Sequence, residues 1–196
     1  MASDDATLEG NHVGSYDAGH WLAFQDQPQK LPKDITFQAM STDDMAFLSE
    51  LYRTTRWQEV LQAPWTDEQR KSFLQQQFDA QHQHYLTHYP NAEMLVIKYQ
   101  GNSIGRIYVD RDDTSICLID VALLPSHQKQ GIGTALLQEL LLEAQQQQVT
   151  VMIHVENFNP AYPWYLKHGF KQVEDKGVYQ YMEWYPETGD QEKTAS

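Results

Sequence analysis

The chain has 196 residues, a formal net charge of -13 at pH 7 and one cysteine, which fits a single domain with or without tails. Because phosphate backbones demand basic patches, the acidic balance argues against nucleic acid or an anionic membrane as a partner, and it favours cationic substrates. The chain has no apolar run long enough to cross a bilayer, no signal-peptide pattern and no disulfide partner for Cys117, so we predict a cytoplasmic protein without a membrane span.

Residues 1–33 are expected to form an N-terminal arm, because they are rich in Asp, Gly, Gln and Pro and show no period. The arm also carries apolar side chains that are unusual for a solvated segment, namely Tyr16, Trp21, Leu22 and Phe24. We therefore expect either a flexible tail or a segment docked on the domain or on a neighbouring subunit. Residues 34–186 are expected to form the domain, and residues 187–196 a polar tail.

One strand and two helices are predicted at the start of the domain. Residues 35–40 read as a strand, and Ser41 or Thr42 is expected to cap the first helix. Thr66 and Gln69 form a capping-box signature that opens a second, long helix.

The predicted centre of the domain has three strands and a third helix. Residues 93–99 and 104–110 are expected to pair as a hairpin. Residues 116–124 are rich in β-branched side chains and end at Pro125, which indicates a buried strand. Apolar side chains at 3.6-residue spacing over residues 136–144 then predict an amphipathic helix.

The segment Gln128-Lys-Gln-Gly-Ile-Gly133 connects that buried strand to the amphipathic helix. The first N–H groups of a helix lack acceptors within the helix, and the helix dipole places partial positive charge there. Since Gly131 and Gly133 have no Cβ, a diphosphate can approach the backbone closely, and Lys129 adds a positive charge. The segment therefore predicts a site for a nucleotide-like diphosphate.

The spacing of the glycines excludes the two most common phosphate loops. A Walker loop needs a glycine followed by Lys-Ser or Lys-Thr, and a dinucleotide fingerprint needs a third glycine where Leu136 stands. What remains is Q-x-x-G-x-G after a strand that carries Val121-Ala122-Leu123. This pattern resembles the pyrophosphate loop of the GNAT superfamily of acetyl-CoA-dependent N-acetyltransferases.

A second segment downstream tests the resemblance. Residues 149–155 read as a strand, Asn159 as an N-cap, Pro160 as the first residue of a short helix and Gly169 as its left-handed end. The family has an asparagine, a small residue, an aromatic-tyrosine pair and a closing Gly-Phe in this place. The matching residues are Asn159, Ala161, Trp164, Tyr165, Gly169 and Phe170. The spacing from asparagine to tyrosine is one residue shorter than is common in the family. Residues 170–174 and 178–184 then predict a final hairpin.

The resemblance covers roughly residues 35–185 and implies the fold. We expect an α/β acyl-CoA N-acyltransferase fold with a mixed, mostly antiparallel sheet, splayed between its fourth and fifth strands and with helices on both faces. Backbone groups of the apolar triplet should pair with the pantetheine arm of acetyl-CoA, and the loop should hold the pyrophosphate. The expected cofactor-binding residues are Val121, Ala122, Leu123, Gln128, Lys129, Gln130, Gly131, Ile132, Gly133, Thr134 and Asn159.

The implied reaction is direct transfer of the acetyl group to a primary amine of a small molecule or peptide. Tyr165 is the expected proton donor to the departing thiolate, since a phenol can give up a proton as charge builds up on sulfur. His154 is the expected base, because a neutral imidazole suits proton abstraction near pH 7. Asp120 and Glu156 are alternative bases.

Several questions stay open at the level of sequence. The pair His84 and His88 has metal-binding spacing, but no acidic residue completes an H-E-x-x-H pattern, so we predict no metal site. An alternative to catalysis is a non-catalytic acyl-CoA-binding regulatory module. The pattern does not identify the acceptor amine, and a homodimer through the N-terminal arm or the last strands is compatible with it.

Overall fold

The computed structural model describes residues 31–187, so the predicted N-terminal arm and C-terminal tail lie almost wholly outside the described residues. The elements in chain order are β1 (Ile35–Ala39), the 3-10 turn η2 (Thr42–Asp44), α2 (Met45–Val60), α3 (Asp67–His88), β2 (Glu93–Tyr99), β3 (Asn102–Arg111), β4 (Ser115–Leu123), the 3-10 turn η3 (Pro125–His127), α4 (Ile132–Gln147), β5 (Thr150–Glu156), α5 (Tyr162–Lys167), β6 (Lys171–Asp175) and β7 (Tyr179–Trp184). No helix in this part of the chain is long and apolar enough to cross a membrane.

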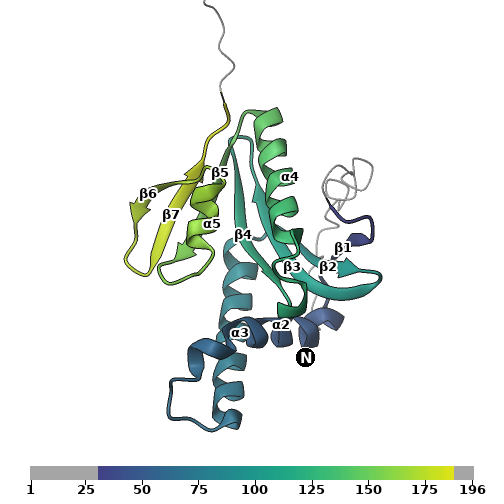
Figure 1. The fold of residues 1–196 in the computed structure, drawn as a ribbon, viewed down its shortest axis with the longest axis vertical. Coiled ribbons are helices and arrows are strands. Elements are labelled where there is room, and N and C mark those ends of the chain that lie inside the picture. Colours follow the sequence, from purple (N-terminus) through teal and green to yellow (C-terminus); the bar gives the residue numbers. More distant parts are fainter. Residues whose placement is uncertain (1–30, 188–196) are drawn as a thin grey trace, which may run out of the picture.

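The seven strands form one sheet in the order β1-β2-β3-β4-β5-β7-β6 (Figure 1). Every neighbouring pair is antiparallel except β4 and β5, which run parallel. The chain returns from β4 to β5 through α4, because a parallel neighbour requires a crossover rather than a tight turn. These observations confirm the predicted mixed, mostly antiparallel sheet.

The sheet is splayed between β4 and β5, also as predicted. The two strands pair only from Ser115–Thr150 to Leu118–Ile153. Beyond this point β4 continues to Leu123 alongside β3, whereas β5 continues to Glu156 alongside β7. The splay therefore leaves one backbone edge of β4 without a strand partner over its last residues.

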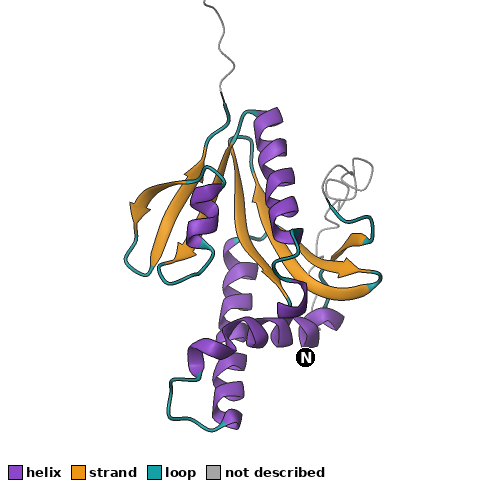
Figure 2. Ribbon diagram, in the orientation of Figure 1, coloured by secondary structure: helices purple, strands orange, loops and turns teal. Residues whose placement is uncertain are grey.

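Helices cover both faces of the sheet (Figure 2). On one face α4 buries Leu136 and Leu140 against strand residues such as Ile107 and Ile153, and α5 adds Tyr165 to the same core. On the other face α2 and α3 pack on β2 through a smaller cluster made of Leu48, Phe78 and Val96. Because successive strand residues alternate between the two faces, apolar side chains on both faces give the central strands a nearly continuous apolar sequence.

The predicted caps of the first two helices both form capping boxes, the first at the 3-10 turn η2 that leads into α2 and the second at the start of α3. Ser41 and Asp44 form a capping box, in which the Ser41 N–H donates to the Asp44 carboxylate over 2.9 Å. Thr66 and Gln69 form a second, in which the Gln69 N–H donates to Thr66 Oγ1 over 3.3 Å and the Gln69 side chain accepts from the Thr66 N–H over 2.8 Å. Both boxes satisfy N–H groups that a helix start leaves without partners.

The start of α5 differs from the prediction by two residues. The helix begins at Tyr162 rather than Pro160, because Asn159 Oδ1 accepts a hydrogen bond from the Ala161 N–H (2.9 Å) and holds a turn ahead of the helix. The end of α5 agrees with the prediction, since Gly169 has a φ of +91° in the left-handed region.

Candidate active site

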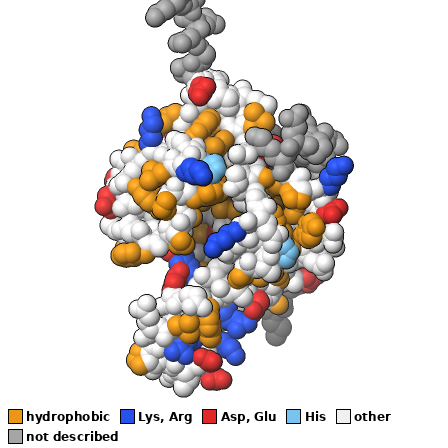
Figure 3. Space-filling model, in the orientation of Figure 1, with side chains coloured by type: hydrophobic (Ala, Val, Ile, Leu, Met, Phe, Trp, Pro, Cys, Tyr) orange, Lys and Arg blue, Asp and Glu red, His pale blue; other side chains and the backbone are white. Residues whose placement is uncertain are grey.

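A cavity of about 1350 Å³ lies at the splay of the sheet. Its walls come from the end of β4, the loop before α4, the end of β5, the β5–α5 loop and the middle of α5, together with the turn between β6 and β7 and the C-terminal half of α2. The surface is hollowed where the lobe formed by the end of α2 and the start of α3 meets the body of the molecule (Figure 3). Residues far apart in the chain thus share one open space.

The apolar triplet Val121, Ala122 and Leu123 lines the cavity along the free edge of β4. Its residues pair with Ile107, Arg106 and Gly105 of β3 on one side, and β5 has already diverged on the other. Backbone groups on this open edge can bind an extended ligand as an additional strand would bind.

The loop before α4 forms one end of the cavity. Gly131 has a φ of +86°, which favours glycine, and a Cβ added at Gly131 or Gly133 would meet no heavy atom within 4 Å. The loop is held by its own side chains, since Gln128 Nε2 donates to the Leu123 carbonyl (2.8 Å) and Gln130 Nε2 donates to the Ser126 carbonyl (2.7 Å). An open glycine backbone at the N-terminus of a 16-residue helix is suited to bind an anion.

The structure brings most of the predicted loop residues to the cavity. Those that line it are Gln128, Lys129, Gly131, Gly133 and Thr134. The other two lie within the loop but outside the lining, because Gln130 bonds the loop backbone and Ile132 is buried in the core.

Tyr165 faces the cavity from α5 and is only 7% exposed. Its ring packs edge-on against Trp164 (4.9 Å between ring centroids) and Phe170 (5.5 Å), and Trp164 Nε1 donates to Thr134 Oγ1 of α4 over 3.3 Å. Burial, and then the neighbouring Asp120 carboxylate, raise the pKa of Tyr165 well above its ordinary value. The hydroxyl is therefore protonated at every physiological pH, and the packed ring holds it at the cavity wall.

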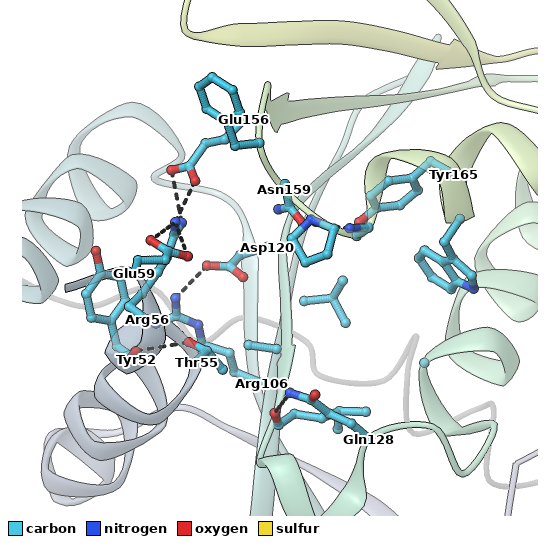
Figure 4. Close-up of a pocket in the computed structure, with 18 of the residues that line it drawn as sticks. Tyr52, Thr55, Arg56, Glu59, Arg106, Asp120, Gln128, Glu156, Asn159 and Tyr165 are labelled. Atoms are coloured by element: carbon cyan, nitrogen blue, oxygen red, sulfur yellow. Dashed lines mark hydrogen bonds and ion pairs between the residues drawn. The ribbon is translucent and has the colours of Figure 1, made fainter. Parts of the chain in front are cut away.

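Asp120 lines the cavity and forms a buried ion pair with Arg106. Its Oδ2 accepts from Arg106 Nη2 over 2.6 Å and from the Tyr85 hydroxyl over 3.2 Å, and Arg106 also donates to Gln81 Oε1 over 2.7 Å. Among the described residues no hydrogen bond to Asp120 Oδ1 is formed, so that oxygen is available for a ligand. Figure 4 shows Asp120 and Arg106 on one side of the cavity and Tyr165 on the other.

We expect Asp120→Asn to lower the free energy of unfolding by about 3 kcal/mol, because it leaves the charge of Arg106, which is 3% exposed, without a counter-ion. Urea titration followed by circular dichroism measures this. The control is Glu50→Gln, which removes the partner of Arg53 in an exposed ion pair and should change stability by less than about 1 kcal/mol. Equal effects of the two substitutions would contradict a buried, unscreened pair.

A second ion pair crosses the mouth of the cavity. Arg56 of α2 donates through both terminal nitrogens to Glu156 at the end of β5 (2.6 and 2.9 Å) and also contacts Glu59 (3.1 Å). Figure 4 shows the two carboxylates directed at this one guanidinium. The three side chains, which we call the Glu59–Arg56–Glu156 triad, carry a net charge of -1 and make this end of the cavity attractive to a cation.

His154 lies outside the residues that line the cavity. Its ring lies tilted against that of Tyr181 of β7 with 5.0 Å between centroids, and burial together with Lys176 lowers the pKa of His154. Asn159 does line the cavity, although its side-chain oxygen is engaged by the Ala161 N–H. The structure therefore unites Tyr165 with two of the three candidate bases, Asp120 and Glu156.

Sequence reasoning missed Arg56, Arg106 and Glu59. Arg106 carried a usable signal, because a lone charge inside the apolar run of β3 must find a buried partner. The sequence gives no comparable signal for Arg56 and Glu59, since charged residues are common on the exposed faces of helices. The rings of His84 and His88 stack 4.0 Å apart, and no group of three or more potential metal ligands occurs within residues 31–187.

Comparisons with known proteins agree with the fold. Residues 90–172 match the family model described as an acetyltransferase (GNAT) domain. The fold is similar to PaiA N-acetyltransferase of Thermoplasma acidophilum in complex with coenzyme A, with TM-score 0.58, 20% identity and coverage of 77% of this chain and 98% of that one. It is also similar to a Pyrococcus horikoshii protein, with TM-score 0.55, 17% identity and coverage of 79% of this chain and 99% of that one. A third similar structure is an acetyltransferase of Thermus thermophilus, with TM-score 0.53, 16% identity and coverage of 76% of this chain and 95% of that one. No curated protein matches the chain by sequence.

Proposed function

We propose that the chain, whose residues 90–172 match the GNAT acetyltransferase domain model, moves an acetyl group from acetyl-CoA directly to a primary amine of a small molecule or peptide. The observation that carries this proposal is the arrangement around the splay. An anion-binding helix start, an unpaired strand edge, a protonated tyrosine and a carboxylate follow one another along a single cavity.

The residues present fit acetyl-CoA as co-substrate. The open backbone from Gln128 to Gly133 would hold the pyrophosphate, with Lys129 adding charge, and the free edge of Val121 to Leu123 would pair with the amides of the pantetheine arm. Acetyl-CoA supplies an activated thioester. The chain supplies its orientation beside Tyr165 and Asp120, and such positioning can account for a large part of a rate enhancement.

The proposed reaction is a direct displacement. The lone pair of the neutral amine attacks the thioester carbonyl carbon, so that a C–N bond forms, the C–S bond breaks and its electron pair goes to sulfur. Tyr165 donates its hydroxyl hydrogen to the sulfur as negative charge develops there. The nitrogen loses one proton to Asp120 Oδ1, directly or through water, and solvent exchange returns both groups to their starting state.

We assign the base to Asp120, one of the alternatives considered from the sequence. Asp120 Oδ1 is free, and the carboxylate lies close enough to Tyr165 to raise its pKa. Both oxygens of Glu156 are engaged by Arg56, and His154 does not reach the cavity. The base must lie within hydrogen-bond reach of the amine, directly or through one water, so geometry favours Asp120.

The function is tested by release of free thiol from acetyl-CoA in the presence of a panel of primary amines. We expect amine-dependent turnover by the wild type and a fall in kcat/KM of about 100-fold in Asp120→Asn, measured where circular dichroism shows it folded. His154→Gln distinguishes the two bases, since it should retain activity close to the wild type.

Two results would count against the proposal. Micromolar binding of acetyl-CoA without turnover on any amine would favour the alternative, a non-catalytic acyl-CoA-binding regulatory module. A loss in His154→Gln as large as that in Asp120→Asn would return the role of base to His154.

A further inference from the structure

Two apolar side chains at the mouth of the cavity are exposed to water. Phe158, in the loop between β5 and α5, is 99% exposed, and Val178, in the turn between β6 and β7, is 68% exposed. Both line the same cavity as Tyr165 and Asp120. A phenylalanine ring left entirely in water beside a reaction space gains favourable free energy as soon as an apolar surface covers it.

The two exposed side chains stand on a hydrogen-bonded platform. The Asn157 N–H donates to the Val178 carbonyl (3.1 Å), Asn157 Nδ2 donates to the Gly177 carbonyl, and Gln180 Nε2 donates to Asn157 Oδ1 (2.8 Å). These bonds join the β5–α5 loop to the β6–β7 turn. They hold the backbone next to Phe158 and at Val178, so both side chains start from positions at the mouth of the cavity that the fold determines. Less backbone ordering is then required when a ligand covers them.

The charged side chains next to Phe158 and Val178 determine which kind of ligand can bind over them. Glu156 precedes Phe158 by two residues and belongs to the Glu59–Arg56–Glu156 triad, whose net charge is -1. On the facing wall, the Arg56 guanidinium lies 5.9 Å from the centre of the Tyr52 ring. A ligand that is complementary both to the negatively charged triad and to the exposed side chains of Phe158 and Val178 has a positively charged nitrogen with an apolar group attached to it.

We propose that Phe158 and Val178 determine acceptor specificity, and that the acceptor is an amine carrying an aryl or branched alkyl group within a few bonds of its nitrogen. This inference rests on the proposed function. The triad attracts the ammonium form of the acceptor to the cavity mouth, where it gives one proton to solvent, and the apolar body packs on Phe158 and Val178. The neutral nitrogen then attacks the thioester and loses its second proton to Asp120.

Steady-state thiol release with two matched amines tests the proposal. Phenethylamine and ethylamine share the same ammonium group and alkyl chain, and only the first carries an aryl body. We expect the wild type to prefer phenethylamine in kcat/KM by about tenfold or more, and Phe158→Ala to remove most of that preference by raising the KM of phenethylamine. The KM values of ethylamine and acetyl-CoA should stay unchanged, and Val178→Ser should act in the same direction with a smaller effect.

The matched control is Leu142→Ala, which truncates a 48% exposed leucine on α4 that does not line the cavity, and it should leave both amines unaffected. The proposal is overturned if Phe158→Ala affects the two amines equally, or if it raises the KM of acetyl-CoA, which would place the ring against the cofactor. If the wild type turns over neither amine, the proposed function fails separately. In that case calorimetric titration of phenethylamine into the protein with coenzyme A bound tests the role of Phe158 by itself. Phe158→Ala is expected to weaken the binding of phenethylamine about tenfold, and unchanged binding would overturn the proposal.

Discussion

Replacing Gly131 with glutamate is expected to lower the affinity for acetyl-CoA by about 100-fold or more, because like charges brought together in a binding site cost several kcal/mol. Gly131 lines the cavity at the start of α4, and a side chain there extends into open space. The added carboxylate would thus occupy the place that we propose for the pyrophosphate. Calorimetric titration with acetyl-CoA measures the loss.

Gly101→Glu is the control for this substitution. Gly101 has a φ of +81°, close to the +86° of Gly131, and a Cβ there also meets no atom within 4 Å. It lies in the turn between β2 and β3, outside the cavity lining. Both variants introduce the same charge and the same backbone strain, so a difference in affinity reports the loop alone. Equal binding by the two variants would exclude the α4 loop as the pyrophosphate site.

Replacing Tyr165 with phenylalanine is expected to lower kcat by about 100-fold while changing the affinity for acetyl-CoA by less than about threefold. The substitution removes only the hydroxyl, and the ring contacts with Trp164 and Phe170 remain. The interaction that is lost forms only as the thiolate leaves, so it affects the transition state rather than binding. Thiol-release kinetics and calorimetry measure the two quantities separately.

The pH profile provides a second test of Tyr165. Because burial and Asp120 raise its pKa above the ordinary value of 10.0, the hydroxyl stays protonated up to at least that pH. An alkaline fall of kcat in the wild type is therefore not expected below about pH 10.

The matched control for Tyr165→Phe is Tyr162→Phe, since Tyr162 lies on the same helix and donates to Gln172 Oε1 (2.8 Å) away from the cavity. A kcat for Tyr162→Phe as low as that for Tyr165→Phe would show that damage to α5, rather than loss of the donor, slows the reaction.

The order and type of the elements could be predicted because their signals are local. The capping boxes at Ser41 and Thr66, the β-branched runs of the central strands and the left-handed Gly169 each depend on residues within a few positions of one another. The same holds for the loop before α4, where the glycines and the helix start are contiguous. The start of α5 was misplaced because the Asn159 turn competes locally with the cap that was expected.

The composition of the reaction centre could not be predicted, because it depends on contacts between distant parts of the chain. His154 and Glu156 lie on the same side of β5, since side chains two apart on a strand share a face. Only Glu156 reaches the cavity, because the splay begins beyond Ile153 and because α2 brings Arg56 across 100 positions of sequence to meet it.

Sequence alone therefore predicted the end of the cavity that we propose for the cofactor, where one continuous loop and one strand carry the whole pattern. Tertiary structure alone decided the make-up of the end that we propose for the acceptor, where Arg106 bonds Asp120 and the joined β5–α5 loop and β6–β7 turn expose Phe158. The physical reason is that backbone amides and glycines act through local conformation, whereas the value of a charged or aromatic side chain depends on the partners that folding places around it.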